Sequence, residues 1–442
     1  MSKGLEVREV FLSEVLANKD ARIDSQFFTM AQSKNPKLHY RRLGELLVSS
    51  EYGLSNEMNE DGKGYPIYRM NEMHSMLCDL DVAKCADINA SEAKEFLLRD
   101  GDLLFNRTNS YELVGRCGVF YGAERGEKVF ASYLVRLNTN KDLLLPECAA
   151  ALLNTRYGVQ EIRRRARQSI NQTNVNPEEV KEIEVPAFEM GFQLRIRDAF
   201  RTAYQCLVEA EGKYKEAEAD LLSELGFSNW HPTNDGASVK SFSEMINAGR
   251  IDAEYFQPKF DELMRRLAKC ELRDLGGQDG LVDLYKSIDP PSDFYGDEGV
   301  PFVRIADFSK FGVESPEVRL PEDACRDCRR IRKDTILLTK DGSVGIAYKA
   351  EGDSDAVTSG AILHLTLKDG AVDPDYLTLV LNSRIVQMQA ERDAGGSIIQ
   401  HWKPSQVEKV KIPVLPRRIQ SSLADKVRES FRLRNESKRL LD

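Results

Sequence analysis

The sequence has no apolar run that approaches the ~20 residues needed to cross a membrane as a helix. Its first ten residues, MSKGLEVREV, also lack the apolar core of a signal peptide. We therefore expect a cytoplasmic protein with no membrane partner, in which the eight scattered cysteines stay reduced. At 442 residues the chain is long enough for two or three domains.

The motifs of common catalytic sites are missing as well. There is no G-x-G-x-x-G, no P-loop and no H-E-x-x-H, and none of the five histidines lies beside a serine or cysteine in a recognisable nucleophile elbow. Asp289 is followed by two prolines, as in the Asp-Pro-Pro-Tyr loop of adenine methyltransferases, but Ser292 replaces the aromatic residue that would stack on a base. The sequence thus predicts a non-catalytic chain.

A cysteine-based metal site is not expected either. Cys325 and Cys328 form the only C-x-x-C pair, and zinc normally requires a second pair or histidines at matching spacing. We interpret this pair as part of a helix. The net charge of −9 argues against a protein that coats nucleic acid non-specifically, but it leaves room for a local basic groove.

The second half of the sequence repeats the first at a spacing near 228 residues. The matching segments occur in the same order throughout. They are 11–28 with 241–256, 65–73 with 300–308, 101–120 with 333–348, 146–156 with 374–384, and 176–186 with 403–413. A repeat of this length indicates one whole domain that is duplicated, and not a solenoid of short units.

Each copy has the pattern of a mixed α/β domain. Apolar alternating runs such as 66–70 and 335–338 predict strands. The segments 146–167 and 374–392 begin with proline and carry apolar residues at helical spacing, so each predicts one helix. The expected fold class is therefore mixed α/β, with two tandem pseudo-repeat domains.

A long helix is expected after each copy. From 193 to 225, apolar residues recur in alternating steps of four and three, as in a coiled-coil seam. The members of the seam are Ile196, Phe200, Ala203, Leu207, Ala210, Tyr214, Ala217 and Leu221, and those of its C-terminal counterpart are Ile419, Leu423, Val427 and Phe431. One such helix would be explained by packing on its own domain. Two at equivalent positions favour an antiparallel coiled coil that joins and spaces the domains.

These patterns predict five segments. Residues 1–190 and 239–416 are the two duplicated domains. Residues 191–226 are a central spacer helix, 227–238 a linker, and 417–442 a C-terminal spacer helix.

Polar loops occur at matching places in the two copies. The first copy has them at 106–110 and 168–174, and the second at 340–343 and 395–403. Asn, Gln and Arg can pair in a bidentate way with base edges, whereas Lys, Ser and Thr suit phosphates and single acceptors. Such residues also fill turns for conformational reasons. Because four polar loops stand at duplicated positions and differ in sequence between the copies, we favour recognition.

Four segments occur in an order that is typical of one protein family: VPFVRIADF, GDLLFNRTNSYELVG, KDTILLTKDGSVG and GGSIIQHWKPSQVEKVKIPVLP. With them, the sequence resembles the specificity subunit of type I restriction–modification systems over nearly the whole chain. The layout of that family is two target recognition domains in tandem, each followed by a long spacer helix. Gln193 and Gln420 match the glutamine that usually follows the proline-rich step.

The resemblance implies a function and a set of partners. The chain would be a non-catalytic subunit that binds double-stranded DNA at a bipartite target, in DNA methylation and phage defence. Two copies of an adenine-N6 methyltransferase subunit would clamp onto the spacer helices, with restriction motor–nuclease subunits as further partners. S-adenosylmethionine would bind the methyltransferase, so this chain itself would hold no cofactor and no metal.

The resemblance also assigns roles to the polar loops and the helices. The expected DNA-binding residues are Arg69, Asn106, Arg107, Thr108, Asn109, Ser110, Arg167, Gln168, Asn171, Gln172, Asn174, Arg304, Lys340, Ser343, Ser397, Gln400, His401, Trp402 and Lys403. The expected partner-binding residues of the helices are Phe200, Leu207, Tyr214, Leu221, Leu423, Val427 and Phe431.

Two other functions remain open. One is the specificity subunit of a related modification or phage-defence system that lacks the standard nuclease, which co-purification would reveal. The other is a protein-interaction scaffold whose polar loops bind peptides. DNA binding weakens steeply as the salt concentration rises, because counterions are released, whereas peptide binding would be insensitive to salt.

Overall fold

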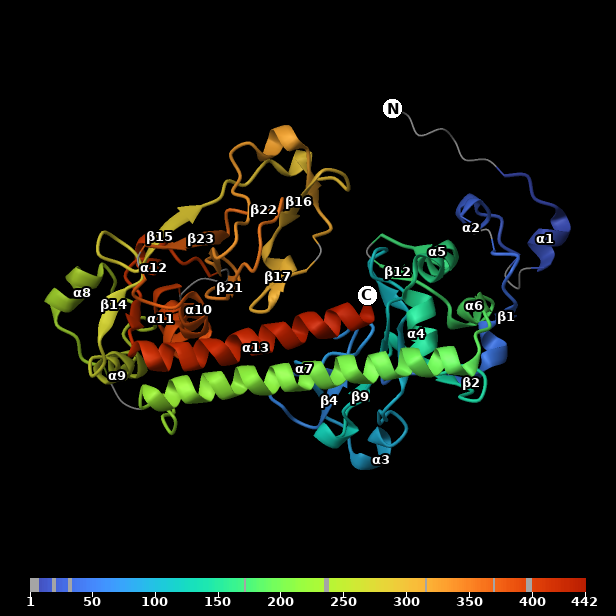
Figure 1. Cartoon of the computed structure of the whole chain (residues 1–442), viewed down its shortest axis with the longest axis horizontal. Coiled ribbons are helices and arrows are strands. Elements are labelled where there is room, and N and C mark those ends of the chain that lie inside the picture. The colour runs from blue at the N-terminus through green and yellow to red at the C-terminus, as the bar shows by residue number, and fades with distance from the viewer. Residues whose placement is uncertain are drawn as a thin grey trace. The chain divides into compact units, whose positions relative to one another are not determined.

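The computed structural model of the protein describes residues 8–17, 21–30, 34–170, 172–233, 238–314, 316–368, 370–394 and 400–442 (Figure 1). The chain divides into two compact units. The first unit comprises Met1–Val208 and Arg434–Asp442, and the second comprises Glu209–Leu433. Both units contain helices and strands, so the predicted mixed α/β class is confirmed. None of the described helices is long and apolar enough to cross a bilayer.

The first unit is built on a four-stranded antiparallel sheet of order β2–β10–β6–β8. Its strands are β2 Leu47–Tyr52, β6 Leu103–Asn106, β8 Cys117–Val119 and β10 Leu134–Thr139. Helix α4 (Pro146–Asn154) packs against β6 and β8, and α5 (Arg156–Arg165) follows it. All four residues of β6 are buried, because this strand lies between two others and beneath α4.

Shorter elements complete the first unit. β4 and β9 run parallel, and β5 and β3 extend that sheet in the order β3–β5–β4–β9. β1 pairs with β13 and so joins the beginning of the unit to its end. The bounds are α1 Leu12–Ala17, α2 Ser25–Thr29, β1 Tyr40–Arg42, η1 Leu43–Leu46, β3 Met58–Asn59, β4 Tyr65–Tyr68, β5 Cys85–Ala86, α3 Ala90–Ala93, β7 Thr108–Asn109, η2 Ala123–Arg125, β9 Val129–Phe130, β11 Arg167–Gln168, β12 Thr173–Asn174, α6 Pro177–Lys181 and β13 Glu184–Pro186.

The second unit contains an antiparallel sheet with the corresponding strand order, β15–β23–β20–β21. β16 and β22 run parallel with β19 beside β16, and β14 pairs with β24. The bounds are α8 Phe242–Ala248, α9 Pro258–Leu267, β14 Leu272–Asp274, β15 Val282–Lys286, η3 Ser292–Phe294, β16 Val300–Val303, η4 Ile305–Asp307, β17 Phe308–Ser309, β18 Gly312–Val313, β19 Arg319–Leu320, η5 Glu322–Cys325, β20 Ile336–Thr339, β21 Ala347–Lys349, β22 Val357–Thr358, β23 Ile362–Leu367, α10 Pro374–Asn382, α11 Arg384–Ala394, α12 Pro404–Val407 and β24 Lys411–Pro413.

The single helix predicted over 146–167 is wrong, and so is the one predicted over 374–392. Each is divided into two helices by one extended residue, Thr155 (ψ 160°) in the first unit and Ser383 (ψ 154°) in the second. The hydroxyl of each donates a 2.6 Å hydrogen bond to a carbonyl of the preceding turn. A short hydroxyl side chain can compete with the helix for backbone groups, and this ends the first helix.

Two long helices, α7 (Met190–Glu224) and α13 (Arg417–Leu441), cover the segments where the sequence predicts spacers. The division into compact units falls inside both helices, at 208/209 and 433/434. It does not fall at 190 or 416, because each unit packs against its own part of each helix.

Within the second unit, the two helices lie side by side and antiparallel (Figure 1). The Oγ of Ser430 donates to the carbonyl oxygen of Ala210 at 2.7 Å, and Lys426 Nζ lies 2.6 Å from a carboxylate oxygen of Asp220. Within the first unit, Leu440 and Leu441 pack against the hydrophobic core that α7 enters.

A buried glutamine anchors the start of each long helix in its unit. Gln193 accepts a hydrogen bond from the amide of Leu145 at 2.8 Å and donates to two backbone carbonyls. Gln420 accepts from the amide of Asp373 at 2.8 Å and also donates to two carbonyls. Only 1% of each glutamine is exposed. The two units thus use the same bonds at the same place.

The predicted helix around the C-x-x-C pair is only partly present. Cys325 is the last residue of the short 3₁₀ helix η5, and Cys328 lies beyond it. Among the residues that the structure describes, no group of three His, Cys, Asp or Glu is arranged to hold a metal ion.

Candidate nucleic-acid interface

In the first unit, strands β2 and β6 end at the same edge of the sheet. Both are antiparallel to β10, and their last residues, Tyr52 and Asn106, pair with neighbouring residues at its start, Val135 and Leu134. The chain that leaves β6 therefore emerges beside the end of β2. This edge is where the first of the predicted polar loops begins.

The two polar loops predicted in the first unit meet. β7, β11 and β12 form a small antiparallel sheet in the order β11–β12–β7. Within it, Asn174 pairs with Thr108 on one side and with Arg167 on the other. Residues 106–110 and 167–174, far apart in the sequence, thus form one surface, which we call the first loop pair.

The first loop pair presents most of the expected polar side chains. Exposed are Arg167, Gln168 and Gln172, and half-buried are Arg107, Asn109, Ser110 and Asn174. A guanidinium nitrogen of Arg167 lies 2.9 Å from a carboxylate oxygen of Glu179, which fixes the direction of this side chain. Asn171 was also expected to bind DNA, but it lies outside the described residues.

Two expected contacts of the first loop pair are corrected by their burial. Asn106 is 0% exposed, because β6 extends one residue further than predicted and carries its side chain into the interior. Its amide donates to the carbonyl of Met70 at 3.3 Å. Thr108 is 3% exposed, and its hydroxyl donates to the side chain of Asn174 at 2.6 Å. Both residues support the loops and do not reach the surface.

Arg107 stacks on an exposed tyrosine that the sequence interpretation missed. Its guanidinium carbon lies 5.2 Å from the ring centre of Tyr52, which is 51% exposed at the end of β2. Three buried polar atoms of this loop find no hydrogen-bond partner among the described residues: Asn106 Oδ1, Arg107 Nε and Ser110 Oγ. Native buried polar groups are rarely left unpaired, so this loop has unused capacity for a ligand or water.

The arginines at the end of α5 are not a solvated helix face. Arg164 donates to the carbonyl of Phe27 at 3.1 Å, and its guanidinium carbon lies 4.4 Å from that ring centre. Burial, together with the neighbouring charge of Arg165, lowers the pKa of Arg164. Arg165 forms a 2.5 Å ion pair with Glu161, and Arg163 donates to a backbone carbonyl at 2.9 Å. This part of the run holds the N-terminal segment in place.

The second unit repeats the arrangement of strands and loops. β15 and β20 end at one sheet edge, and the chain after β20 meets the segment after 399. Asp341 and His401 form an antiparallel bridge, and the amide of Gly342 donates to the carbonyl of Gln400 at 2.9 Å. We call residues 340–343 and 400–403 the second loop pair.

The exposed residues of the second loop pair are Ser343, His401 and Lys403, and Gln400 is half-buried. Two expected contacts are corrected. Trp402 is 1% exposed and belongs to the hydrophobic core, and Lys340 is 8% exposed and forms an ion pair with Asp341. Ser397 was also expected to bind DNA, but it lies outside the described residues.

An ion cluster joins the two halves of the second loop pair. Asp341 contacts Lys340 on one oxygen and His401 Nδ1 at 2.9 Å on the other. Burial raises the pKa of Asp341, but the hydrogen bonds from Lys340 and His401 outweigh it, and the net shift is downward. The carboxylate therefore stays ionised and keeps the two segments together.

Arg69 and Arg304 occupy equivalent places directly after β4 and β16. Each is bonded to an acidic side chain three residues later, Glu72 or Asp307, which also accepts from the arginine's own backbone amide at 2.8 or 2.9 Å. Both arginines are half-buried. They share the function of closing a turn, and the structure leaves their expected DNA contacts untested.

The residues expected to bind partners on the long helices are instead used inside this chain. In the second unit, Tyr214 and Leu221 of α7 share one buried core with three residues of α13, and in the first unit Phe200 is 2% exposed. The three α13 residues are Leu423, Val427 and Phe431. Leu207 is partly buried against the first unit's core. A partner subunit would therefore have to bind other faces of these helices.

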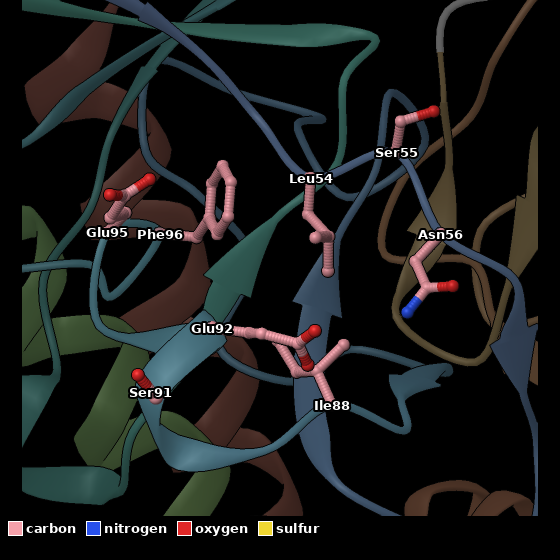
Figure 2. A pocket seen from close by; sticks show the side chains of 8 residues that line it. All are labelled: Leu54, Ser55, Asn56, Ile88, Ser91, Glu92, Glu95 and Phe96. Carbon is pink, nitrogen blue, oxygen red and sulfur yellow. The ribbon is translucent and has the colours of Figure 1, made fainter.

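A cavity of about 550 Å³ opens in the first unit (Figure 2). Leu54, Ile88 and Phe96 form its apolar part, while Glu92 and Glu95 bring carboxylates to it. Carboxylates repel the phosphates of a nucleic acid, so this cavity is a poor candidate for DNA binding.

No protein-family model matches the chain. The type I restriction enzyme EcoKI specificity subunit of Escherichia coli (strain K12) is 34% identical over 100 residues, which are 22% of this chain and 22% of that protein. The chain thus matches about a fifth of that relative's length. The putative type I restriction enzyme MjaX specificity subunit of Methanocaldococcus jannaschii is 21% identical over 391 residues, 88% of this chain and 85% of that protein.

Among solved structures, the S subunit of a type I restriction–modification system from M. genitalium has 12% sequence identity to this chain and a TM-score of 0.41, over 92% of this chain and 94% of that one. Because that score is low, the sequence relatives carry the comparison. The predicted resemblance to type I specificity subunits is confirmed.

Proposed function

We propose that this chain is the DNA-specificity subunit of a type I restriction–modification system. Its two target recognition domains lie within 1–190 and 239–416, and each reads one half of a bipartite target. The chain directs a partner adenine-N6 methyltransferase, and a restriction motor–nuclease where one is present, to that target. It performs no chemistry itself, and S-adenosylmethionine binds the methyltransferase.

The observation that carries this proposal is the meeting of the predicted polar loops in each unit. Residues far apart in the sequence form the first loop pair through β7, β11 and β12, and the second through the bridge between Asp341 and His401. Loops held on a rigid sheet are typical of recognition surfaces. The two loop pairs differ in sequence, which suits two unlike half-sites.

The side chains fit contacts with bases and phosphates. Arg107, Asn109 and Gln168 can donate to or accept from base edges, and Lys403 suits a phosphate. The buried atoms of the first loop pair that lack a partner support the same function, since a bound nucleotide or its water would satisfy them.

The absence of catalysis is part of the proposal. Asp289, which follows the adenine-methyltransferase pattern most closely, accepts a 2.7 Å hydrogen bond from the amide of Gly360. A carboxylate that fixes a backbone turn in this way has a structural task. Transfer of a methyl group to DNA by the purified chain alone would contradict the proposal.

The test is a map of N6-methyladenine in host DNA with and without the gene. The proposal expects one bipartite sequence motif that loses methylation when the gene is deleted. Binding of the purified protein to that motif should weaken steeply with salt. Unchanged methylation, together with salt-insensitive binding to a peptide, would instead identify a protein-interaction scaffold. Co-purification with a methyltransferase but no ATP-driven nuclease would identify a related modification system.

A further inference from the structure

A second cavity, of about 800 Å³, lies in the second unit and is rich in arginine. It is lined by Glu322, Asp323, Cys325, Arg326, Asp327, Cys328, Arg329, Arg330 and Arg332. Arg330 is neutralised within the chain, because it forms ion pairs with Glu322 and Asp355. Arg326, Arg329 and Arg332 are exposed, and we call these three residues the arginine cluster.

The arginine cluster has a counterpart of opposite charge in the first unit. β19 pairs antiparallel with β16 as β5 pairs with β4, and a single helical turn follows each, η5 after β19 and α3 after β5. The turn at η5 leads into the arginine cluster. The turn at α3 leads into the cavity of Figure 2, which Glu92 and Glu95 line. The same place in the duplicated fold is thus cationic in one unit and acidic in the other.

Arg329 is held rigidly at the edge of the sheet. Its amide donates to the hydroxyl of Ser287, directly after β15, at 3.0 Å, and its carbonyl accepts from the amide of Thr358 at 3.2 Å. Its guanidinium carbon lies 4.0 Å from the ring centre of Tyr285, which is 38% exposed. An arginine stacked in this way loses little side-chain entropy when it binds a ligand.

The arginine cluster and the second loop pair flank the same turn, residues 358–361. On one side Thr358 is bonded to Arg329, and on the other the amide of Lys340 donates to the carbonyl of Ala361 at 2.9 Å. Lys340 begins the second loop pair. A DNA duplex lying on that loop pair would therefore pass close to the arginine cluster.

We propose that the arginine cluster binds the sugar–phosphate backbone of the DNA whose bases face the second loop pair, and that the first unit has no such contact. This inference rests on the proposed function. Guanidinium groups match phosphate oxygens in charge and geometry, and backbone contacts add affinity without sequence information. The two units therefore contribute unequally to the salt dependence of binding.

The test compares the full chain with the triple variant Arg326→Gln, Arg329→Gln and Arg332→Gln. Affinities for the methylated target and for an unrelated duplex are measured between 50 and 200 mM salt. Each lost phosphate contact reduces the salt slope by about 0.9, so this fourfold change in salt should weaken the variant about 3.5-fold less per contact than the wild type. The loss of affinity should be equal for both duplexes.

Two control variants separate charge from folding. The triple lysine variant of the same positions should keep the wild-type salt slope, because its charges remain. Neutralising the first unit's cavity with Glu92→Gln and Glu95→Gln should leave the slope unchanged.

Two results would overturn the inference in different ways. If the wild type binds its target specifically but the triple glutamine variant keeps the full slope, the arginine cluster does not touch DNA, and the proposed function stands. If the wild type shows no DNA binding, the proposed function itself fails. Loss of affinity for the target alone would show base recognition instead of backbone contact.

Discussion

Replacing Gln420 by methionine should detach the start of α13 from the second unit. The side chain is 1% exposed and makes two hydrogen bonds of 2.8 Å, with the amide of Asp373 and the carbonyl of Leu415. Methionine has a similar size but cannot form them. Each buried backbone group left without a partner costs about 1–3 kcal/mol, and both groups lie near enough to the surface to regain some hydration. We expect a total loss of about 2–4 kcal/mol in the free energy of local opening.

Hydrogen exchange measured by mass spectrometry reports this loss where it occurs. A loss of about 2–4 kcal/mol corresponds to roughly 30- to 700-fold faster exchange in the segments around Asp373 and at the start of α13. Segments of the first unit should be unchanged. The matched variant Gln193→Met should show the reverse pattern, with faster exchange around Leu145 and none in the second unit.

The control is Gln205→Met, since Gln205 is an exposed glutamine on α7 and its replacement should alter exchange by less than about 0.5 kcal/mol. Wild-type exchange in Gln420→Met would show that the glutamine bonds do not hold the helix. Equal acceleration in both units would show that the units do not open separately. Either outcome would refute the reasoning.

The remaining predictions concern recognition and spacing. Arg107→Ala and Lys403→Ala should each weaken DNA binding, by about 1–3 kcal/mol with relaxed preference at one position if the residue contacts a guanine, or equally for all sequences if it contacts phosphate; filter binding to a duplex library distinguishes these, and unchanged affinity of both variants would make the loops structural. Because the pKa of Asp341 is lower in the folded chain, its ion cluster stabilises the fold above the unfolded pKa and loses this effect as pH falls through the folded pKa. The stabilities of Asp341→Asn and the wild type should therefore converge in acid denaturation series, and a constant difference would contradict this. Inserting one heptad after Val208 and one after Leu433 keeps the helical seam in phase and adds about 10.5 Å to each helix. Sequencing of the methylated sites should then show about three more unread base pairs and unchanged half-sites, while altered half-sites would exclude the helices as the spacer.

Much of the architecture could be predicted because it is written in local patterns. Hydrophobic periodicity locates α7 and α13 to within two residues of the predicted starts, and the order of the repeat anticipates two sheets of matching strand order. The helix breaks at Thr155 and Ser383 escaped prediction, since threonine and serine also occur inside helices. Only the tertiary contacts of each helix decide whether the hydroxyl ends it.

The candidate site was located correctly as a set of segments but not residue by residue. Polar composition and duplication identify the loops that meet in each unit. They do not reveal that Asn106 and Trp402 are buried, because burial depends on how far β6 extends and on the core that each residue enters. The partners of Tyr52 and Tyr285 were missed for a related reason. A single tyrosine at the end of a strand carries no signal until the arginine that stacks on it is known.

The sharing of α13 has a consequence for the birth of the protein on the ribosome. The first unit includes Arg434–Asp442, and Leu440 and Leu441 pack against its core. The half that is synthesised first therefore cannot finish folding until the last residues of the chain have left the exit tunnel. Such a contact, formed across almost the whole chain, is slow to close. A chain that terminates early would keep this part of α7 uncovered, and its exposed apolar surface would mark the unfinished product for chaperones and proteases.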